Sequence, residues 1–341
     1  MSGGPELCRA VVTGATGFVG RWLCVLLRDN GLIVRAVARR AAEGPWHEIR
    51  EVDLTDPTAG ADLYDGADVV FHLAALTHDA ALAAEEEEYR RLNVQATRFV
   101  VAAALAAGVR NLVFLSSVKA MGEGGREPQT EQDPPRPATP YGRTKLEAED
   151  LVLAVGREGR PAIHTAVVRA PLIYGPGAGG NLGALIHAAR CRRLLPLPDV
   201  GNRRSLVDVR DVAQVLLLVA RHPKAAGRVW LVTDGAEYST ARMCALVRQA
   251  LGQAEPGWCL PGWLLDGAAD LGSVLRRCGL PFPFDRERYH KLLGSACYSS
   301  CALAEELGFV PAHTLASALP DMVAAGVSSR QIGVDRAGLS G

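Results

Sequence analysis

Three residues of this chain, Ser117, Tyr141 and Lys145, could together move a proton to or from an oxygen atom. Tyr141 and Lys145 stand four residues apart, and on a helix that spacing puts both side chains on one face. A phenol ordinarily has a pKa of about 10, and an ammonium group one turn away stabilises the phenolate and lowers that pKa. The pair therefore predicts a general acid or base, although an ordinary surface pair of an aromatic and an aliphatic residue has the same spacing.

The elements around these residues support the chemical interpretation. The apolar run Leu112–Ser117 is typical of a buried strand, and it ends in two hydroxyl groups. Ligands of open parallel sheets bind at that carboxyl edge. Thr139 and Pro140 supply an N-cap and a first-turn proline, so the helix that carries the phenol and the ammonium is expected to begin there.

A glycine-rich turn near the N-terminus predicts a dinucleotide site. The apolar run Ala10–Val12 leads into three glycines with the spacing G-x-x-G-x-x-G, and an amphipathic segment, Phe18–Leu27, follows at once. The order strand, turn, helix is the context that this motif requires. Gly14 allows a turn with positive φ, Gly17 lets the backbone approach a pyrophosphate, and Gly20 lets the helix pack close to the strand. A glycine-rich turn without a ligand is the alternative.

The end of the second expected strand, Ile33–Ala38, bears on the choice of cofactor. NAD-binding sheets carry an acidic residue there, which accepts hydrogen bonds from the adenosine ribose. This chain has Ala38 followed by Arg39 and Arg40, and guanidinium groups suit a 2′-phosphate. NADP(H) is therefore the expected cofactor, with NAD(H) as the alternative; two solvated surface arginines would also explain the pattern.

The next strand ends offer further contacts. Asp53 follows the short strand Ile49–Val52 and could hold an adenine amino group, although a solvated loop aspartate is nearly as good an interpretation. The apolar run that begins at Val69 is expected to be a buried strand, followed by small residues that leave room for a cofactor. His72 in that run is expected to be a core histidine with its hydrogen bonds satisfied. Asn93 is expected to bond across to a neighbouring strand from a helix.

Length, charge and cysteine usage limit the class of protein. The 341 residues suit a large α/β domain with a second lobe, and the formal net charge of +0 gives no field that would favour nucleic acid. No segment resembles a signal peptide or reaches the length of a membrane span, so a cytoplasmic location is expected. The 8 cysteines form no C-x-x-C pair and no zinc-ligand pattern, so buried reduced thiols and no metal are expected.

The chain resembles an extended short-chain dehydrogenase/reductase. The matching motifs are Thr13–Gly20, Asp53-Leu54, His72–Ala75, Asn93-Val94, Ser116-Ser117, Tyr141-x-x-x-Lys145 and Arg169–Pro176. The resemblance implies an α/β fold, a Rossmann-type doubly wound parallel sheet with a smaller, mostly helical C-terminal substrate lobe. It also implies catalysis by Ser117, Tyr141 and Lys145. Family members that dehydrate nucleotide sugars carry Asp-Glu directly after the hydroxyl residue, whereas this chain has Val118-Lys119, which argues against 4,6-dehydration.

The resemblance also implies domains and contact residues. An NAD(P)-binding domain is expected at 1–172, with 206–233 returning to it, a substrate lobe at 173–205 and 234–327, and a flexible tail at 328–341. The residues implied to contact the cofactor are Gly14, Thr16, Gly17, Phe18, Val19, Arg39, Arg40, Asp53, Leu54, Leu73, Ala74, Ala75, Asn93, Tyr141, Lys145 and Pro171. Those implied to contact the substrate are Ser117, Asn181, Arg204 and Lys291.

Segments of the second half indicate a substrate class. Leu292–Ser299 and Ala304–Pro311 closely resemble the C-terminal segment of bacterial reductases of 4-keto-6-deoxy nucleotide sugars, which make UDP-N-acetylquinovosamine-type precursors of surface polysaccharides. Arg204 falls where nucleotide-sugar enzymes place an arginine on the diphosphate. The expected function is NADP(H)-dependent reduction of the 4-keto group of a UDP-linked sugar. The alternatives are a nucleotide-sugar 4-epimerase, a reductase of steroid-like or phenylpropanoid-like alcohols, and a non-catalytic NADP sensor, which would not need a tuned phenol.

Three helical segments carry predictions about surfaces. Trp263–Leu275 is apolar around most of its circumference and is expected to be a buried helix of the small lobe, with a membrane-interfacial helix as the alternative. Gln95–Ala107 and Leu146–Val155 have apolar stripes. In the family such helices pair across a two-fold axis, so a homodimer is expected, unless both stripes only cover the sheet.

Some local structure is also expected in the second half. Pro171–Gly180 is rich in proline and glycine and is expected to be a loop, after which Asn181 opens a helix. Asp211 is expected to cap the helix that follows it.

Overall fold

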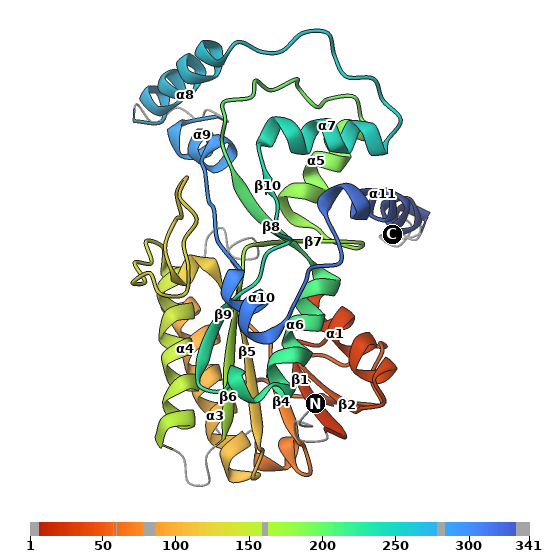
Figure 1. Cartoon of the computed structure of the whole chain (residues 1–341), viewed down its shortest axis with the longest axis vertical. Helices are drawn as coiled ribbons and strands as arrows, with labels where there is room; N and C mark the ends of the chain where they lie inside the picture. Colours follow the sequence, from red (N-terminus) through yellow and green to blue (C-terminus); the bar gives the residue numbers. More distant parts are fainter. Residues whose placement is uncertain are drawn as a thin grey trace, which may run out of the picture.

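A seven-stranded parallel sheet forms the centre of the larger lobe in the computed structural model, in the order β3-β2-β1-β4-β5-β6-β9 (Figure 1). The strands are β1 (Arg9–Thr13), β2 (Ile33–Ala38), β3 (Glu48–Glu51), β4 (Val69–His72), β5 (Asn111–Ser117), β6 (His164–Ala170) and β9 (Arg228–Leu231). The structure describes residues 7–331 apart from 57, 59, 78–85, 159–162 and 278–283. The strand order reverses between β1 and β4, and ligands of doubly wound sheets bind at such a point. The expected doubly wound parallel sheet is confirmed.

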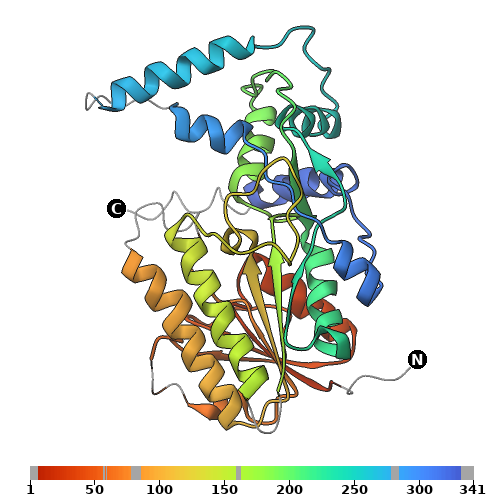
Figure 2. The same ribbon diagram turned by 60° about the vertical axis from the view of Figure 1, so that its left-hand side comes forward.

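Helices cover both faces of this sheet because its strands are apolar on both sides (Figure 2). α1 (Phe18–Asp29) and α6 (Val209–Arg221) pack together on one face, and α3 (Ala96–Ala106) and α4 (Pro140–Glu158) pack on the other. Successive strand residues point to opposite faces, so Val12 joins the first core and Val11 the second.

The helix expected to carry Asn93 is interrupted by a wider turn. It consists of α2 (Glu86–Tyr89), a π-helical segment at Arg90–Gln95 and then α3. Asn93 lies inside the wide turn and is 2% exposed. Single π-helical turns are frequent at functional sites, and this one aims an amide side chain toward the loop after β4.

The smaller lobe is built on a three-stranded sheet in the order β10-β8-β7. Its elements are β7 (Leu172–Tyr174), α5 (Gly180–Arg190), β8 (Arg204–Asp208), β10 (Glu237–Tyr238), α7 (Thr240–Ala250), α8 (Gly262–Arg277), α9 (Arg286–Leu293) and α11 (Leu315–Gln331). The described residues also form the short 3-10 turns η1 (Ala61–Tyr64), η4 (Val118–Ala120) and η5 (Pro223–Ala225), and the helix α10 (Cys301–Leu307), which packs on β9.

Four details of this lobe differ from the expectations. The expected loop Pro171–Gly180 contains β7, because Leu172–Tyr174 pairs with β8. α5 begins at Gly180, one residue before Asn181. The expected boundary between residues 205 and 206 falls inside β8. The expected tail from 328 continues α11 as far as Gln331, and residues 332–341 lie outside the described residues.

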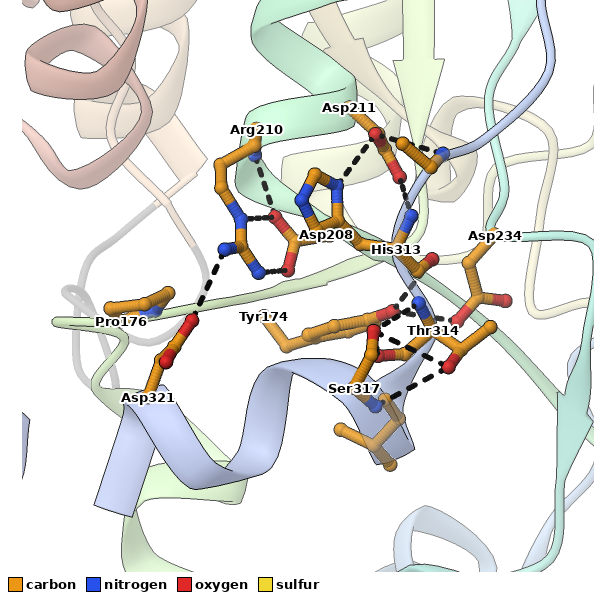
Figure 3. Close-up of polar contacts among 12 residues, drawn as sticks. Tyr174, Pro176, Asp208, Arg210, Asp211, Asp234, His313, Thr314, Ser317 and Asp321 are labelled. Atoms are coloured by element: carbon orange, nitrogen blue, oxygen red, sulfur yellow. Dashed lines mark hydrogen bonds and ion pairs between the residues drawn. The ribbon is translucent and has the colours of Figure 1, made fainter. Parts of the chain in front are cut away.

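Acidic side chains join the two lobes to the C-terminal segment (Figure 3). The N-cap of α6 is Asp208, which accepts a hydrogen bond from the Arg210 N–H at 2.8 Å, so the expectation that Asp211 caps this helix is wrong. Asp211 instead accepts hydrogen bonds from the backbone N–H groups of Ala312 and His313, and its Oδ1 lies 3.0 Å from His313 Nδ1. The segment before α11 is thereby tied to α6.

A second buried carboxylate lies beside this contact (Figure 3). The Tyr174 and Tyr238 hydroxyl groups both donate to Asp234 Oδ2 at 2.8 Å. Burial raises the pKa of the Asp234 carboxyl, and the two phenols oppose that shift by stabilising its charged form. β7 and β10 are thus joined through one oxygen atom.

α8 contradicts the expectation of a buried helix. Trp263 is 71% exposed, Leu271 55% and Val274 54%. α8 packs on α9, where Arg286 forms ion pairs with Asp266 and with Asp270 on α8. Apolar side chains of α8 lie around most of its circumference, but α9 covers only one side of the helix. Within the described part of the chain, every helix is too short or too polar to cross a lipid bilayer.

Candidate active site

The glycine turn leaves no room for larger side chains between β1 and α1. Gly14 has a φ of +70°, and a Cβ added to it would lie 2.7 Å from the Ala74 nitrogen. A Cβ added to Gly20 would lie 2.3 Å from the Gly14 oxygen, so α1 packs directly against the turn. Gly17 is the N-cap residue of α1, so no side-chain oxygen of that residue occupies the first-turn N–H groups. These N–H groups suit a phosphate.

The polar residues at the end of β4 satisfy one another. His72 Nδ1 lies 2.7 Å from Thr13 Oγ1, and His72 Nε2 lies 2.9 Å from Thr97 Oγ1. Burial, aided by the positive charge of Lys145, lowers the pKa of His72 to about 3. His72 is therefore a neutral core histidine, as expected. The Ala74 N–H donates to Thr13 Oγ1, which holds the small residues after β4 beside the glycine turn.

Asn93 joins the loop after β4 to α4. Its Oδ1 accepts a hydrogen bond from the Leu76 N–H at 2.7 Å, and its Nδ2 donates to the Leu76 carbonyl and to Thr144 Oγ1. The expected bond to a neighbouring strand is thus made to the loop that follows a strand. Because Thr144 precedes Lys145, Asn93 also fixes the helix turn that carries the ammonium group.

The start of α4 lies against the turn that follows Ser117. Thr139 Oγ1 accepts a hydrogen bond from the Gly142 N–H at 3.1 Å, which confirms the expected cap. A Cβ added to Gly142 would lie 2.3 Å from the Lys119 carbonyl oxygen, so the two segments touch. Tyr141 on α4 and Ser117 at the end of β5 therefore lie on abutting segments. Ser117 Oγ also accepts a hydrogen bond from the Lys119 N–H.

Lys145 lies one helical turn after Tyr141 on α4 and is 2% exposed. Its Nζ donates to the Leu115 carbonyl at 2.8 Å and lies 4.0 Å from the ring centroid of Phe114. Burial lowers the pKa of Lys145 to about 7, and the negative charge of Glu149 opposes that shift. A proton on Lys145 is therefore exchangeable near neutral pH.

A buried ion pair that the sequence analysis did not assign lies next to these residues. Glu149 on α4 and Arg169 on β6 have side chains that are 1% and 5% exposed. Glu149 follows Lys145 by four residues, as Lys145 follows Tyr141, and this spacing is the sequence pattern that points to Glu149. Its partner Arg169 comes from a distant segment, so the sequence could not show the pair.

The residues expected to select the cofactor lie beyond the end of β2. Arg39 and Arg40 are exposed, and neither forms a hydrogen bond or ion pair within the described part of the chain. The Asp53 carboxylate accepts hydrogen bonds from the N–H and hydroxyl groups of Thr55, and these bonds lower its pKa. Asp53 is therefore turned toward its own loop.

The expected substrate residues lie in the smaller lobe. Arg204 on β8 is partly buried; its Nε donates to the Gly294 carbonyl at 2.9 Å and its Nη2 to the His290 carbonyl at 3.4 Å. These bonds hold Arg204 against α9, which also carries Lys291, whose side chain lies outside the described residues. Asn181 is exposed on α5. Burial lowers the pKa of Arg204.

Two further features do not involve the expected residues. An open pocket of about 360 Å³ lies beside α7, and it is lined by residues that include Arg242, Arg248 and Trp258. None of the expected site residues lines it. Among the residues that the structure describes, no group of three or more His, Cys, Asp or Glu side chains could hold a metal ion.

Comparison with known proteins identifies a family. Residues 10–232 match the model of the NAD dependent epimerase/dehydratase family. The matched stretch begins at the first buried strand and ends just after β9, so it includes the glycine turn and the residues Ser117, Tyr141 and Lys145.

Individual relatives have different activities. The chain is 32% identical over 259 residues to a UDP-glucose 4-epimerase of Vibrio cholerae, which covers 74% of this chain and 77% of the relative. It is 30% identical over 340 residues to a 3 beta-hydroxysteroid dehydrogenase/Delta 5→4-isomerase of Mycobacterium tuberculosis, covering 93% and 90%. A solved structure of MoeE5 in complex with UDP-glucuronic acid and NAD is 27% identical with a TM-score of 0.76, covering 94% and 99%.

Proposed function

The chain belongs to the NAD dependent epimerase/dehydratase family, and on that premise we propose that it reduces the 4-keto group of a UDP-linked 6-deoxy sugar with NADPH. Its relatives are epimerases, reductases and dehydrogenases, so the chain is an NAD(P)-dependent enzyme of the oxidoreductase type. The observation that supports the proposal is the packing of α4 on β5, in which the first turn of α4 touches the turn after Ser117 and Lys145 binds the Leu115 carbonyl.

The glycine turn fits a dinucleotide. A Cβ at Gly14 or Gly20 would collide with backbone, as expected where a turn must stay narrow. We assign the pyrophosphate to the turn from Gly14 to Val19. Arg39 and Arg40 are exposed beyond β2 and are assigned to a 2′-phosphate, which makes NADP(H) the preferred cofactor. When bound, the cofactor supplies the hydride.

The reacting oxygen is assigned to Ser117 and Tyr141. Ser117 donates a hydrogen bond to the keto oxygen, and Tyr141 gives its phenolic proton to that oxygen as the carbon is reduced. Lys145 stabilises the phenolate that remains on Tyr141 and binds the ribose of the cofactor. Because Lys145 is held by the Leu115 carbonyl, its position does not depend on the substrate.

Arg204 is assigned to the diphosphate of the substrate. Its two bonds to backbone carbonyls orient the guanidinium, and a charged group held in this way can form forked hydrogen bonds to phosphate oxygens. The neighbouring structure of MoeE5, solved with UDP-glucuronic acid and NAD, supports a UDP-sugar as the ligand class. Surface polysaccharide synthesis is the corresponding proposed role.

A second candidate is the oxidoreduction of an apolar, steroid-like alcohol or ketone. It is favoured by the match to the hydroxysteroid dehydrogenase, which covers 93% of this chain and therefore includes the smaller lobe, whereas the epimerase match covers 74%. An apolar substrate needs no diphosphate partner, so Arg204 separates the two candidates.

A screen of NADPH oxidation tests the proposal. The panel contains UDP-4-keto-6-deoxy sugars, UDP-glucose and a 3-keto steroid. We expect oxidation with a UDP-4-keto sugar, and we expect Arg204→Gln to raise KM for that substrate while Arg203→Gln leaves it unchanged. Arg203 is a matched control because it is adjacent and its side chain is 53% exposed. Oxidation with the steroid alone would favour the second candidate, and conversion of UDP-glucose without net NADPH oxidation would indicate an epimerase.

A further inference from the structure

Glu149 receives an unusual number of hydrogen bonds for a residue with no assigned role. Arg169 Nε lies 3.0 Å from Oε1 and 3.2 Å from Oε2, and Arg169 Nη2 lies 2.6 Å from Oε2. The Ser116 hydroxyl donates to Oε1 at 2.5 Å. Removing both charges of such a pair from water costs free energy that their attraction often fails to recover. Stability alone is therefore a weak explanation for a buried Glu149.

The contacts of Glu149 connect the elements that carry the candidate catalytic residues. Glu149 lies on α4 one turn after Lys145, Ser116 lies near the end of β5 and Arg169 near the end of β6. Successive side chains of a strand point to opposite faces. The Ser116 hydroxyl points toward Glu149, and Ser117, the next residue of β5, leads into the turn that touches the start of α4.

Among the residues that the structure describes, the Glu149 carboxylate is the negative charge that acts on Lys145, and it is itself paired with Arg169 between α4 and β6. The neutral ring of His72 on β4 is close enough to feel the charge of Lys145, and Tyr141 precedes Lys145 by one turn of α4. β5 contributes the Phe114 ring and the Leu115 carbonyl, which are uncharged. Burial favours loss of the Lys145 proton, and the field of Glu149 opposes that loss.

We propose that Glu149 is a positioning residue that keeps Lys145 in its ammonium form and aligned with the strand end that carries Ser117. The consequences for catalysis rest on the proposed function, but the effect on Lys145 does not. Without the carboxylate charge the buried ammonium loses the field that opposes its deprotonation, so Lys145 loses its proton at a lower pH.

Lysine titration by NMR measures this effect directly. The lysines of the chain are Lys119, Lys145, Lys224 and Lys291, so protein labelled with ¹³C at the lysine ε-carbon gives few signals, and Lys145→Met identifies the relevant one. We expect Glu149→Gln to lower the titration midpoint of Lys145 by about 1 pH unit. Glu149→Asp, which keeps the charge, should restore most of the shift.

Glu147→Gln is the matched control. Glu147 lies on the same helix, but its side chain is 37% exposed and pairs with Arg90 at the surface. The Glu147→Gln variant should leave the titration midpoint of Lys145 unchanged. Equal midpoints in the unmodified protein and Glu149→Gln would overturn the proposal, as would an equal shift in Glu147→Gln.

Two provisions keep the test decisive. If Glu149→Gln does not fold, Glu149→Gln/Arg169→Met removes both charges of the pair and should also lower the midpoint. A Lys145 midpoint far below neutral pH in the unmodified protein would overturn the proposal without any variant, because Lys145 would then be uncharged although Glu149 is present. The titration needs neither cofactor nor sugar, so its failure is separate from a failure of the proposed reaction. Where turnover is measurable, the high-pH loss of activity should move with the midpoint.

Discussion

Lys145 is a cation that folding has removed from water. Its pKa of about 7 arises from burial, against the field of Glu149, while a carbonyl and an aromatic face hold the ammonium in place. A group with this pKa changes charge near neutral pH, which is a common property of residues at functional sites. A reaction that needs the ammonium should therefore slow as the pH rises through 7.

Substitution of a single arginine after β2 tests the proposed preference for NADP(H) over NAD(H). Arg39→Asp replaces a cation that can bind a 2′-phosphate by an anion that repels it and can accept bonds from a ribose. We expect the dissociation constant for NADPH to rise, and the preference over NADH to reverse or disappear, in a fluorescence titration. Lys224→Asp, which makes the same charge change at an exposed site on η5, should change neither constant. Equal constants for both cofactors in the unmodified protein would contradict the assignment.

The sequence predicts those site residues whose neighbours are local. Tyr141 and Lys145 share a face because of helix spacing, and Thr139 caps the helix because a hydroxyl three residues before an N–H can reach it. Arg169, the partner of Glu149, is 20 residues away on strand β6, so no local pattern shows the pair. Asp211 was assigned as a cap from its position, but its carboxylate binds the C-terminal segment.

At the scale of elements, burial depends on what lies next to a helix. The sequence of α8 is apolar on most sides, and the expected burial is wrong because α9 covers only one side. The inner strands β1, β4, β5 and β6 are readily predicted because they are buried on both faces and are therefore mostly apolar, whereas the edge strand β3 is short and charged. β7 was missed because a strand of 3 residues carries too little pattern to distinguish it from a loop.

The contact between α6 and the C-terminal segment gives a prediction about stability. Asp211→Ala leaves two partly buried backbone N–H groups and the His313 ring without their acceptor, at a total cost of about 1–3 kcal/mol. We expect a lower urea midpoint and faster proteolysis near α11. Asp321→Ala removes an exposed ion pair with Arg210 and should cost less than about 1 kcal/mol. Equal effects of both variants would show that Asp211 does not hold this segment.

At the scale of the whole molecule, the assembly remains a prediction. The apolar stripes of α3 and α4 are used in part to cover the sheet, since Val100, Ala104 and Val152 belong to its core. Leu105 on α3 is 39% exposed and is available for a second subunit. We therefore propose a homodimer in which α3 and α4 of one subunit pack against α3 and α4 of the other.

Light scattering at micromolar concentration tests the dimer. We expect twice the chain mass for the unmodified protein and a monomer for Leu105→Arg, because a charge would be buried at the interface. Val310→Arg is the control, since Val310 is 78% exposed and lies outside α3 and α4. A monomeric mass for the unmodified protein would contradict the predicted assembly.

In the proposed reaction, hydride passes from NADPH to the C4 carbon of a UDP-linked keto sugar while Tyr141 supplies the proton. Single-turnover reaction with NADPH deuterated at the transferred position tests it most directly. We expect one deuterium at C4 for each cofactor oxidised, and a rate that is about 10²–10⁴-fold lower in Tyr141→Phe, which keeps the ring and its contacts. A sugar product without deuterium at C4, or an equal rate in Tyr141→Phe, would contradict it.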